Sequence, residues 1–387
     1  MNKYNVIVVG LGAMGSAALY QLSQRGVRVL GIDQYDPPHA LGSSHGDTRF
    51  TRQAIGEGNA YVPLVLRSNE IFEAIERKTG KKLLERVGGL IFGNAEADAI
   101  HGKKNFVQAT IEAAEQFNIK HQVLNAREIS ERFPQFILSG SEVGYFEEGA
   151  GFLRPEVCIE TQLALAKENG AHVLVNTKVL SVEPQDDGSV CVSTEKETYF
   201  ADKAILTTGA WMQTFFTEMK HLFKVYRQVL HWFDCSRDYE QFTPAKFPVF
   251  TWDFGNGKDI YGFPAIDGRD GGIKIASEEY ESESSPDSVD RVVGPDEAVN
   301  MYERYIKGKV RGVLPSIVKS KVCMYTVTPD SDFILDIHPK HRQIVIASPC
   351  SGHGFKHSAA IGEVLADLAT KGETEFDIAP FSIKRFL

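Results

Sequence analysis

The chain opens with an uninterrupted run of apolar, mostly β-branched residues at positions 6–9, and helical periodicity follows at positions 13–25. A second apolar run occupies positions 27–32, directly after Gly26. Continuous β-branched runs are typical of strands buried on both faces of a parallel sheet, whereas apolar residues spaced three or four apart indicate a helix. The pattern therefore predicts a strand, a helix and a second strand.

Two later apolar runs end in glycine-bearing turns. Residues 204–206 lead into Gly209, and residues 344–347 lead toward Gly352 and Gly354. In open α/β sheets, ligands bind at the ends of strands where the chain turns in this way. We therefore assign both runs to the nucleotide-binding part of the protein.

The segment between these runs has a different pattern. Residues 221–278 are rich in aromatic residues and alternate apolar with polar positions, for example over residues 225–233, which suits an antiparallel sheet. The acidic, serine-rich stretch of residues 278–290 is typical of an exposed loop. The sequence thus predicts a nucleotide-binding domain that is interrupted by an inserted substrate domain.

Length and composition agree with two globular domains. A chain of 387 residues is too long for one ordinary core, because single cores stop growing at roughly 250–300 residues. With 43% apolar and 24% charged residues, no stretch approaches the roughly 18 unbroken apolar residues of a membrane span. The first apolar run lacks a basic leader and a small-residue cleavage site, so we expect a cytoplasmic protein.

Charge and cysteine content argue against several kinds of partner. A formal net charge of −9 disfavours nucleic-acid binding, which needs a basic surface. The five cysteines show no close pair and no metal-binding spacing, which indicates reduced thiols and no metal site. We expect neither a nucleic acid nor a membrane nor a metal ion among the ligands.

A glycine motif joins the first predicted strand to the first helix. Gly10, Gly12 and Gly15 match the pattern G-x-G-x-x-G, and Asp33 stands 18 residues beyond Gly15. Gly10 permits a tight turn, Gly12 lets the backbone approach a pyrophosphate, and Gly15 lets the helix pack against the strand. The helix N-terminus offers N–H donors to phosphates. Asp33 is then expected to accept hydrogen bonds from the adenosine ribose.

The motif alone does not separate NAD from FAD. The return of the chain to glycine-bearing strand ends near residues 209 and 352 favours FAD, because distant segments bind FAD along its length. We therefore predict an α/β fold in which a Rossmann-like FAD-binding domain carries an inserted α+β substrate domain, built on a mainly antiparallel sheet. The first domain comprises residues 1–85, 150–220 and 323–387, and the second comprises residues 86–149 and 221–322.

Several motifs in a fixed order carry a family resemblance along the whole chain. They are His45-Gly46-Asp47-Thr48-Arg49 with Arg52 next, residues 61–67, Tyr261-Gly262-Phe263-Pro264, Lys274, Cys323-Met324-Tyr325-Thr326, residues 332–336 and residues 351–356. On these motifs the chain resembles the monomeric sarcosine oxidase and N-methyltryptophan oxidase family.

The resemblance implies a flavoprotein oxidase that demethylates a small N-methyl amino acid, of the sarcosine or N-methyltryptophan type. The partners are then the amino acid and dioxygen, and the products are the demethylated amino acid, formaldehyde and hydrogen peroxide. The resemblance also implies a monomer whose FAD is attached through a cysteine thioether. Cys323 falls at the position of that cysteine.

Three basic residues receive roles from the resemblance. Arg52 and Lys356 match the pair that holds the substrate carboxylate, which suits a guanidinium that can donate two parallel hydrogen bonds and an ammonium that adds charge. Lys274 matches a lysine above the flavin that promotes reaction with oxygen, since a fixed cation stabilises developing superoxide. In an alternating stretch, Lys274 could instead point outward.

Further residues are implied as contacts of the substrate or the flavin. Around the substrate the resemblance places Tyr261, Tyr325, His353 and Arg49. Besides the glycine motif, Asp33 and Cys323, the implied cofactor contacts are Ser43, His45, Thr48, Arg49, Val179, Gly209, Gly352, Gly354 and Lys356.

One position departs from the family. Four residues after the lysine, the family has a histidine that faces the substrate, whereas this chain has Glu278. On an extended strand Glu278 and Lys274 would share one face, which predicts a carboxylate near the substrate and a preference for a cationic or larger substrate. The alternative is a shifted register, in which Glu278 is an ordinary loop residue at the start of the acidic stretch.

Two other functions stay open at this point. The same fold could oxidise another secondary or cyclic amino acid, such as pipecolate, or use an electron acceptor other than oxygen. A protein of another class, a non-catalytic flavin or nucleotide sensor, would need the glycine motif but not the set of Arg52, Lys274 and Lys356. Activity on any secondary amine separates the sensor from the enzymes.

Overall fold

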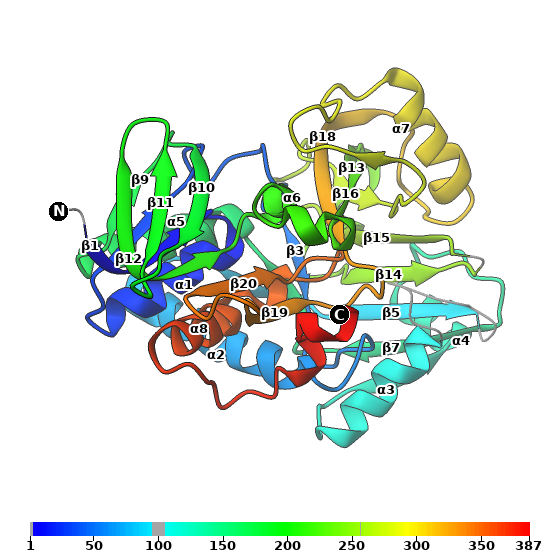
Figure 1. Ribbon diagram of the computed structural model, residues 1–387. Helices are drawn as coiled ribbons and strands as arrows, with labels where there is room; N and C mark the ends of the chain where they lie inside the picture. Colours follow the sequence, from blue (N-terminus) through cyan, green and yellow to red (C-terminus); the bar gives the residue numbers. More distant parts are fainter. Residues whose placement is uncertain (1–2, 95–104, 256) are drawn as a thin grey trace.

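The computed structural model of the protein describes residues 3–94, 105–255 and 257–387. Two large sheets form two lobes that lie side by side in Figure 1, and a small three-stranded sheet lies between them. No helix within the described ranges combines the length and the apolar character that a bilayer crossing requires.

The eight-stranded sheet of the first lobe has a parallel centre in the order β9, β2, β1, β12 and β20. Antiparallel strands β10 and β11 extend the first half of β12, and β19 pairs with β20 at the edge. The eight strands are β1 (Lys3–Val9), β2 (Val29–Ile32), β9 (His172–Leu174), β10 (Val179–Pro184), β11 (Val190–Thr194), β12 (Thr198–Leu206), β19 (Ile334–Ile337) and β20 (Ile344–Ser348).

Four long helices pack beside this sheet. Helix α1 (Ala13–Gln24) contacts α5 (Pro155–Glu168) and α8 (Ser358–Thr370), and α8 also contacts α2 (Tyr61–Thr79). Almost every side chain of α1 and α8 is buried, as expected for helices that are apolar on several faces. The predicted strand, helix and strand at the N-terminus are confirmed as β1, α1 and β2.

The nine-stranded sheet of the second lobe is mainly antiparallel, as predicted, with one parallel pair between β14 and β5. The predicted boundary between residues 322 and 323 falls inside β18, which pairs with β13 over its whole length. The nine strands are β5 (Gly89–Asn94), β6 (Gln122–Asn125), β7 (Glu142–Glu147), β13 (Lys224–Phe233), β14 (Val249–Asp253), β15 (Asp259–Phe263), β16 (Ile273–Ala276), β17 (Glu283–Ser284) and β18 (Ile317–Val327).

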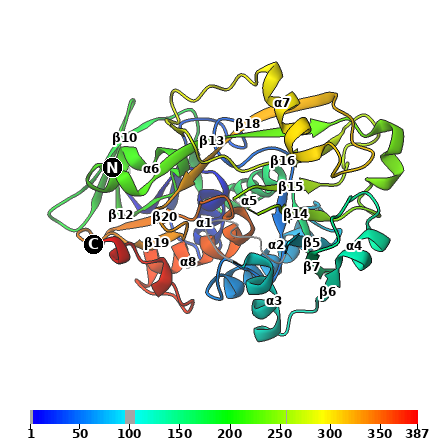
Figure 2. The same cartoon turned by 90° about the vertical axis from the view of Figure 1, so that its right-hand side faces the viewer.

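Aromatic side chains explain the cohesion of the second lobe. Phe92, Phe136, Phe250 and Trp252 lie within one buried cluster, where Trp252 stacks on Phe92 with ring centroids 4.8 Å apart. Helices α3 (Phe106–Gln116) and α4 (Ala126–Arg132) lie at one end of this lobe, and α7 (Pro295–Met301) with the π-helical turn Tyr302–Ile306 lies at the other (Figure 2).

Short elements connect the lobes and carry many of the predicted site residues. The three-stranded sheet contains β3 (Arg49–Thr51), β4 (Leu84–Arg86) and β8 (Gly151–Leu153). The 3-10 turn Gly209–Trp211 and helix α6 (Met212–Phe215) follow β12. The 3-10 turn Phe355–His357 leads into α8. The remaining 3-10 turns are Thr217–Leu222, Ser236–Gln241, Ala379–Phe381 and Ile383–Phe386.

Candidate active site

The glycine motif forms the tight turn between β1 and α1. Gly10 has φ of +89°, and a Cβ atom on it would lie 2.6 Å from the carbonyl oxygen of Thr207. A Cβ atom on Gly15 would lie 1.7 Å from the carbonyl oxygen of Gly10, so this glycine lets the helix pack on the turn. Gly12 has open space around it, since its nearest neighbour would be Ser44 Oγ at 3.6 Å. The turn therefore leaves backbone exposed at the start of α1.

A cavity of about 230 Å³ lies over this turn, at the carboxyl ends of the central strands. Segments far apart in the sequence line it, which is the arrangement that the sequence predicted for FAD. The predicted cofactor contacts in its wall are Gly10, Gly12, Asp33, Ser43, Arg49, Val179, Gly209, Gly352 and Gly354.

The polar groups of this larger cavity fit a dinucleotide. The N-cap residue of α1, Gly12, has no side chain, and the Ala13 N–H makes only a long hydrogen bond to Ser44 Oγ at 3.4 Å, so the first turn can serve a phosphate. The buried hydroxyl of Ser43 lines the cavity and has no hydrogen-bond partner among the described residues. Buried hydroxyls normally have a partner, so this one is suited to a polar ligand.

Asp33 is more constrained than the sequence suggested. Its Oδ2 accepts a hydrogen bond from the Leu11 backbone N–H at 2.7 Å, and its Oδ1 accepts one from Tyr35 N–H at 2.8 Å. A carboxylate has about four lone-pair positions, so acceptor capacity is left for a ribose hydroxyl. Asp33 thus holds the glycine turn in place as well as lining the cavity.

A smaller cavity of about 70 Å³ adjoins the larger one, since Arg49, Tyr325, Gly352 and Phe355 belong to both walls. The structure brings most of the predicted substrate residues together here, along with the predicted cofactor contacts Thr48 and Cys323. These substrate residues are Arg49, Arg52, Tyr261, Glu278, Tyr325, His353 and Lys356.

A buried ion pair forms the floor of the smaller cavity. Arg52 Nη2 lies 2.6 Å from Glu57 Oε2, and the two side chains are 5% and 0% exposed. The second carboxylate oxygen of Glu57 lies 3.9 Å from Lys356 Nζ and 3.8 Å from His353 Nδ1. Lys356 Nζ donates to the carbonyl of His353 at 2.7 Å. Glu57 therefore joins the two predicted carboxylate-binding cations.

Glu57 is a residue that the sequence analysis missed, although a lone acid between Gly56 and Gly58 near Arg52 was an available signal. Burial and then the Arg52 charge lower the pKa of Lys356, the Glu57 and Glu278 charges oppose this, and the resulting pKa is about 7. Lys356 is thus balanced between its charged and neutral forms near neutral pH.

Lys274 lies close to the cavities but in neither wall. It is on the central strand β16, is buried, and its Nζ donates to the carbonyls of Gly46 and Thr48, each at 2.8 Å. The ammonium also lies 4.1 Å from the ring centroid of Phe263. Burial holds the pKa of Lys274 well below its usual value. Lys274 therefore points inward, which contradicts the outward alternative.

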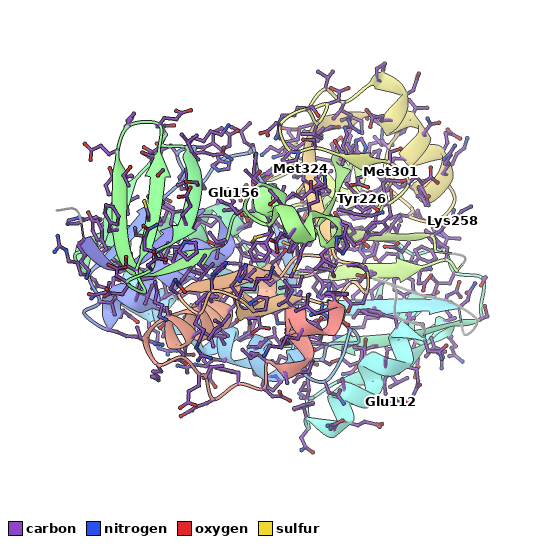
Figure 3. All side chains as sticks on the ribbon, viewed as in Figure 1. Glu112, Glu156, Tyr226, Lys258, Met301 and Met324 are labelled. Carbon is purple, nitrogen blue, oxygen red and sulfur yellow. The ribbon has the colours of Figure 1, made fainter. Side chains whose placement is uncertain are left out.

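The segment that Lys274 contacts is fixed from a second side. Glu156, on α5, accepts hydrogen bonds through Oε1 from the backbone N–H groups of Gly46 at 2.7 Å and Asp47 at 3.2 Å (Figure 3). Arg49 Nη2 donates to the carbonyl of Ser43 at 2.7 Å. These bonds hold the loop of residues 43–49 between the lobes.

Cys323 and His45 lie next to this loop. The Sγ atom of the buried Cys323 is 3.5 Å from the carbonyl of Ser43 and 3.7 Å from Arg49 Nη2. His45 is buried, and neither ring nitrogen has a partner among the described residues. Burial, with the charges of Arg49 and nearby lysines, lowers the pKa of His45 to about 3. His45 is therefore neutral, and it lines neither cavity.

Strand β18 supplies residues to both cavities. Cys323 faces the smaller cavity, Met324 (labelled in Figure 3) faces the larger one, and Tyr325 contributes to both. The hydroxyls of Tyr325 and Tyr261 lie 3.4 Å apart. Burial raises the pKa of both tyrosines, so both are neutral phenols.

The strand argument for Glu278 was wrong, because β16 ends at Ala276 and Glu278 lies beyond it. The carboxylate nevertheless lines the smaller cavity, so the residue is more than a loop position. Its Oε2 accepts a hydrogen bond from the Tyr280 hydroxyl at 2.5 Å. A second carboxylate, Asp259 on β15, lines the same cavity and was not predicted.

The family model described as FAD dependent oxidoreductase matches residues 5–368 of the chain. The monomeric sarcosine oxidase of Streptomyces avermitilis is 38% identical over 383 residues, covering 99% of this chain and 97% of that protein. The N-methyl-L-tryptophan oxidase of Escherichia coli O157:H7 is 35% identical over 393 residues, covering 99% and 100%.

Among solved structures, the open form of NikD, described as an unusual amino acid oxidase, aligns with a TM-score of 0.84 at 21% identity, covering 99% of this chain and 98% of that one. This likeness confirms the fold. Together with the full-length relatives and the matched model, it shows that the chain belongs to the FAD-dependent oxidoreductase family.

Proposed function

We propose that the protein is an oxidase of small N-methyl amino acids. The reaction converts a substrate such as sarcosine, with dioxygen and water, to glycine, formaldehyde and hydrogen peroxide. The observation that carries the proposal is the buried pair of Arg52 and Lys356 at the floor of a small cavity that adjoins the dinucleotide cavity. The relatives named monomeric sarcosine oxidase and N-methyl-L-tryptophan oxidase support it.

The cavity accounts for recognition of a small amino acid. Arg52 Nε is buried and has no hydrogen-bond partner among the described residues, so a donor is left for a carboxylate. Lys356 adds a second cation beside it. The cavity, at about 70 Å³, is small compared with the dinucleotide cavity of about 230 Å³, which suits a small amino acid. The floor therefore binds the carboxylate and orients the N-methyl group.

When bound, FAD would supply the two-electron acceptor for the hydride equivalent that leaves a C–H bond of the N-methyl group while the C–N bond becomes C=N. The chain contributes orientation, exclusion of water and electrostatics. The neutral phenols of Tyr261 and Tyr325 can donate hydrogen bonds in the cavity without adding charge. The substrate amine must bind in its neutral form, because an ammonium has no lone pair to release.

Two further roles belong to the proposal. We assign attachment of the flavin to Cys323, whose buried sulfur lies between the two cavities beside Arg49. We assign promotion of the oxygen reaction to Lys274, whose buried amino group lies directly behind Thr48 in the cavity wall. We also propose a monomeric, cytoplasmic enzyme; the name of the monomeric sarcosine oxidases supports the first of these properties.

A peroxide-coupled assay of the purified flavoprotein tests the function. Sarcosine should give equal amounts of hydrogen peroxide and formaldehyde, whereas sarcosine methyl ester, which lacks the carboxylate, should be a far poorer substrate. Lys356→Met should raise KM for sarcosine and leave the ester unaffected. Absence of peroxide with every N-methyl and cyclic secondary amino acid would exclude an oxidase of this class.

A further inference from the structure

The smaller cavity carries opposite charges in different parts of its wall. Arg52 and Lys356 lie at the floor and are 4% and 3% exposed. Two carboxylates, Asp259 and Glu278, also line the cavity, and both are only half-buried. The cationic part is therefore shielded from water, and the anionic part lies toward solvent.

The two carboxylates come from β15 and from the segment that follows β16. Tyr261 on β15 pairs with Ala276, the last residue of β16; Asp259 is the first residue of β15, and Glu278 lies two residues beyond the end of β16. Residues two apart on a strand share a face, and Tyr261 lines the cavity, so Asp259 is on the cavity side of β15. We call Asp259 and Glu278 the acidic rim.

Nearby groups feel both charges of the acidic rim. The pKa of Tyr280 lies well above its usual value. Desolvation is the largest cause, followed by the charge and the hydrogen bond of Glu278 and then by the charge of Asp259. Glu278 also raises the pKa of Lys356 on the floor. Two carboxylates in the wall of one cavity favour a cation beside them, because opposite charges attract more strongly where water is partly excluded.

A separate observation shows that this cavity is built to hold a ligand. Thr48 Oγ1 and Arg52 Nε both belong to lining residues, are buried, and lack a hydrogen-bond partner among the described residues. Buried donors without partners are rare, and these two suit a carboxylate held at the floor. An amino acid bound there by its carboxylate has its other substituents directed toward the remaining wall, where the acidic rim lies.

Sarcosine has no side chain, so none can reach the acidic rim when its carboxylate is held at the floor. An N-methyl amino acid with a longer side chain can extend that side chain toward the half-buried rim. A carboxylate there attracts positive charge and forms charge-assisted hydrogen bonds with a cation that reaches it.

We propose that Asp259 and Glu278 make this enzyme selective for N-methyl amino acids whose side chain ends in a cation, an ammonium or a guanidinium. The proposal rests on the function proposed above and specifies its substrate class. The floor binds the carboxylate, and the acidic rim binds the distal cation through charge-assisted hydrogen bonds.

Three matched substrates test the proposal on the flavoprotein. They are Nα-methyl-L-lysine, N-methyl-L-norleucine, which lacks the terminal nitrogen, and N-methyl-6-hydroxy-L-norleucine, which keeps a hydrogen-bond donor without charge. Hydrogen bonds to charged groups contribute roughly 10- to 100-fold, so kcat/KM for the lysine derivative should exceed that for norleucine by about this factor. The hydroxyl derivative should resemble norleucine.

Variants of the acidic rim connect the preference to these residues. Glu278→Gln and Asp259→Asn should each lower, by about tenfold, the ratio of kcat/KM for Nα-methyl-L-lysine to kcat/KM for N-methyl-L-norleucine. Glu281→Gln is the matched control, because Glu281 is an exposed carboxylate three residues beyond Glu278 that does not line the cavity. It should keep the wild-type ratio.

The outcomes separate this proposal from the general function. If sarcosine and N-methylnorleucine are oxidised and the lysine derivative has no advantage, the acidic rim does not select a cation and the oxidase function stands. If the hydroxyl derivative equals the lysine derivative, the rim recognises hydrogen-bond donors and the cationic proposal is wrong. If no N-methyl amino acid reacts, both proposals fall together.

Discussion

The buried carboxylate of Glu57 offers a sharp test of how the floor of the smaller cavity is held. In Glu57→Gln the side chain keeps its shape and can still accept one hydrogen bond from Arg52, but the negative charge is lost. Arg52 and Lys356 then remain buried together without their shared anion, which lies 2.6 Å from one and 3.9 Å from the other. Two like charges with no counterion are costly in such surroundings.

The size of the effect follows from these distances. At an effective dielectric constant of about 20, two unit charges about 4 Å apart interact by about 4 kcal/mol. Breaking a buried ion pair from one side typically costs about 3–5 kcal/mol. We therefore expect Glu57→Gln to lower the free energy of unfolding by about 3 kcal/mol, since the glutamine amide retains part of the contact with Arg52.

Urea denaturation followed by tryptophan fluorescence measures this loss. Glu70→Gln is the control. The side chain of Glu70 is 64% exposed and forms an ion pair with Arg67, and such surface pairs contribute about 0–1 kcal/mol. If the two variants unfold at the same urea concentration, the ion pair between Arg52 and Glu57 does not stabilise the floor as argued here.

The Glu57→Gln substitution should also shift the pH dependence of carboxylate binding. The pKa of Lys356 is about 7, and the Glu57 charge opposes its further decrease. The affinity for propionate, a carboxylate without an amine, should therefore fall as pH rises through about 7 in the wild type, because Lys356 loses its proton. In Glu57→Gln the fall should begin at lower pH. In Lys356→Arg it should be absent, since arginine stays protonated.

Three other substitutions test the remaining assignments. Cys323→Ser should release FAD on acid denaturation. Cys350→Ser changes another thiol near the larger cavity and should keep the flavin attached. The reverse result would identify Cys350 as the attachment site. In Lys274→Met, substrate should still reduce the flavin at a substantial rate, but the reduced flavin should reoxidise in air about 10²-fold more slowly. This factor corresponds to the loss of about 3 kcal/mol from one electrostatic stabiliser. If stopped-flow measurement finds reoxidation at the wild-type rate, Lys274 has no part in the oxygen reaction. Glu278→His should improve turnover of sarcosine near neutral pH and lower the apparent pKa of its rate profile, because the carboxylate favours the unreactive ammonium; an unchanged profile would mean that Glu278 does not act on the bound amine.

Local patterns were enough to predict the elements that hold the dinucleotide cavity. The β-branched run of β1, the glycine turn and α1 are close in sequence, and each follows from short-range periodicity and steric demands. The antiparallel second lobe followed from alternation in the same way. Gly209, Gly352 and Gly354 followed from apolar runs that end in glycine-bearing turns, whereas the charged and aromatic side chains of the smaller cavity came mainly from the family resemblance.

Contacts between distant segments were beyond such reasoning. Glu57 becomes important only because Arg52 and Lys356, which are 304 positions apart, converge on it. Asp259 gains its place in the cavity wall as the first residue of β15, where it pairs with Asp253 on β14. Lys274 was placed on the correct strand, but its bonds to the carbonyls of Gly46 and Thr48 depend on the packing of one lobe against the other.

The floor and the acidic rim of the smaller cavity come from separate pieces of the chain. Arg52 follows β3 and Lys356 precedes α8, whereas Asp259 and Glu278 belong to the edge formed by β15 and the end of β16. Carboxylate recognition and side-chain recognition are therefore modular. Substitutions in the rim can redirect the enzyme to new amines without changing the residues that bind the substrate carboxylate. The turn between β15 and β16 and the residues after β16 are therefore the natural region to randomise in directed evolution.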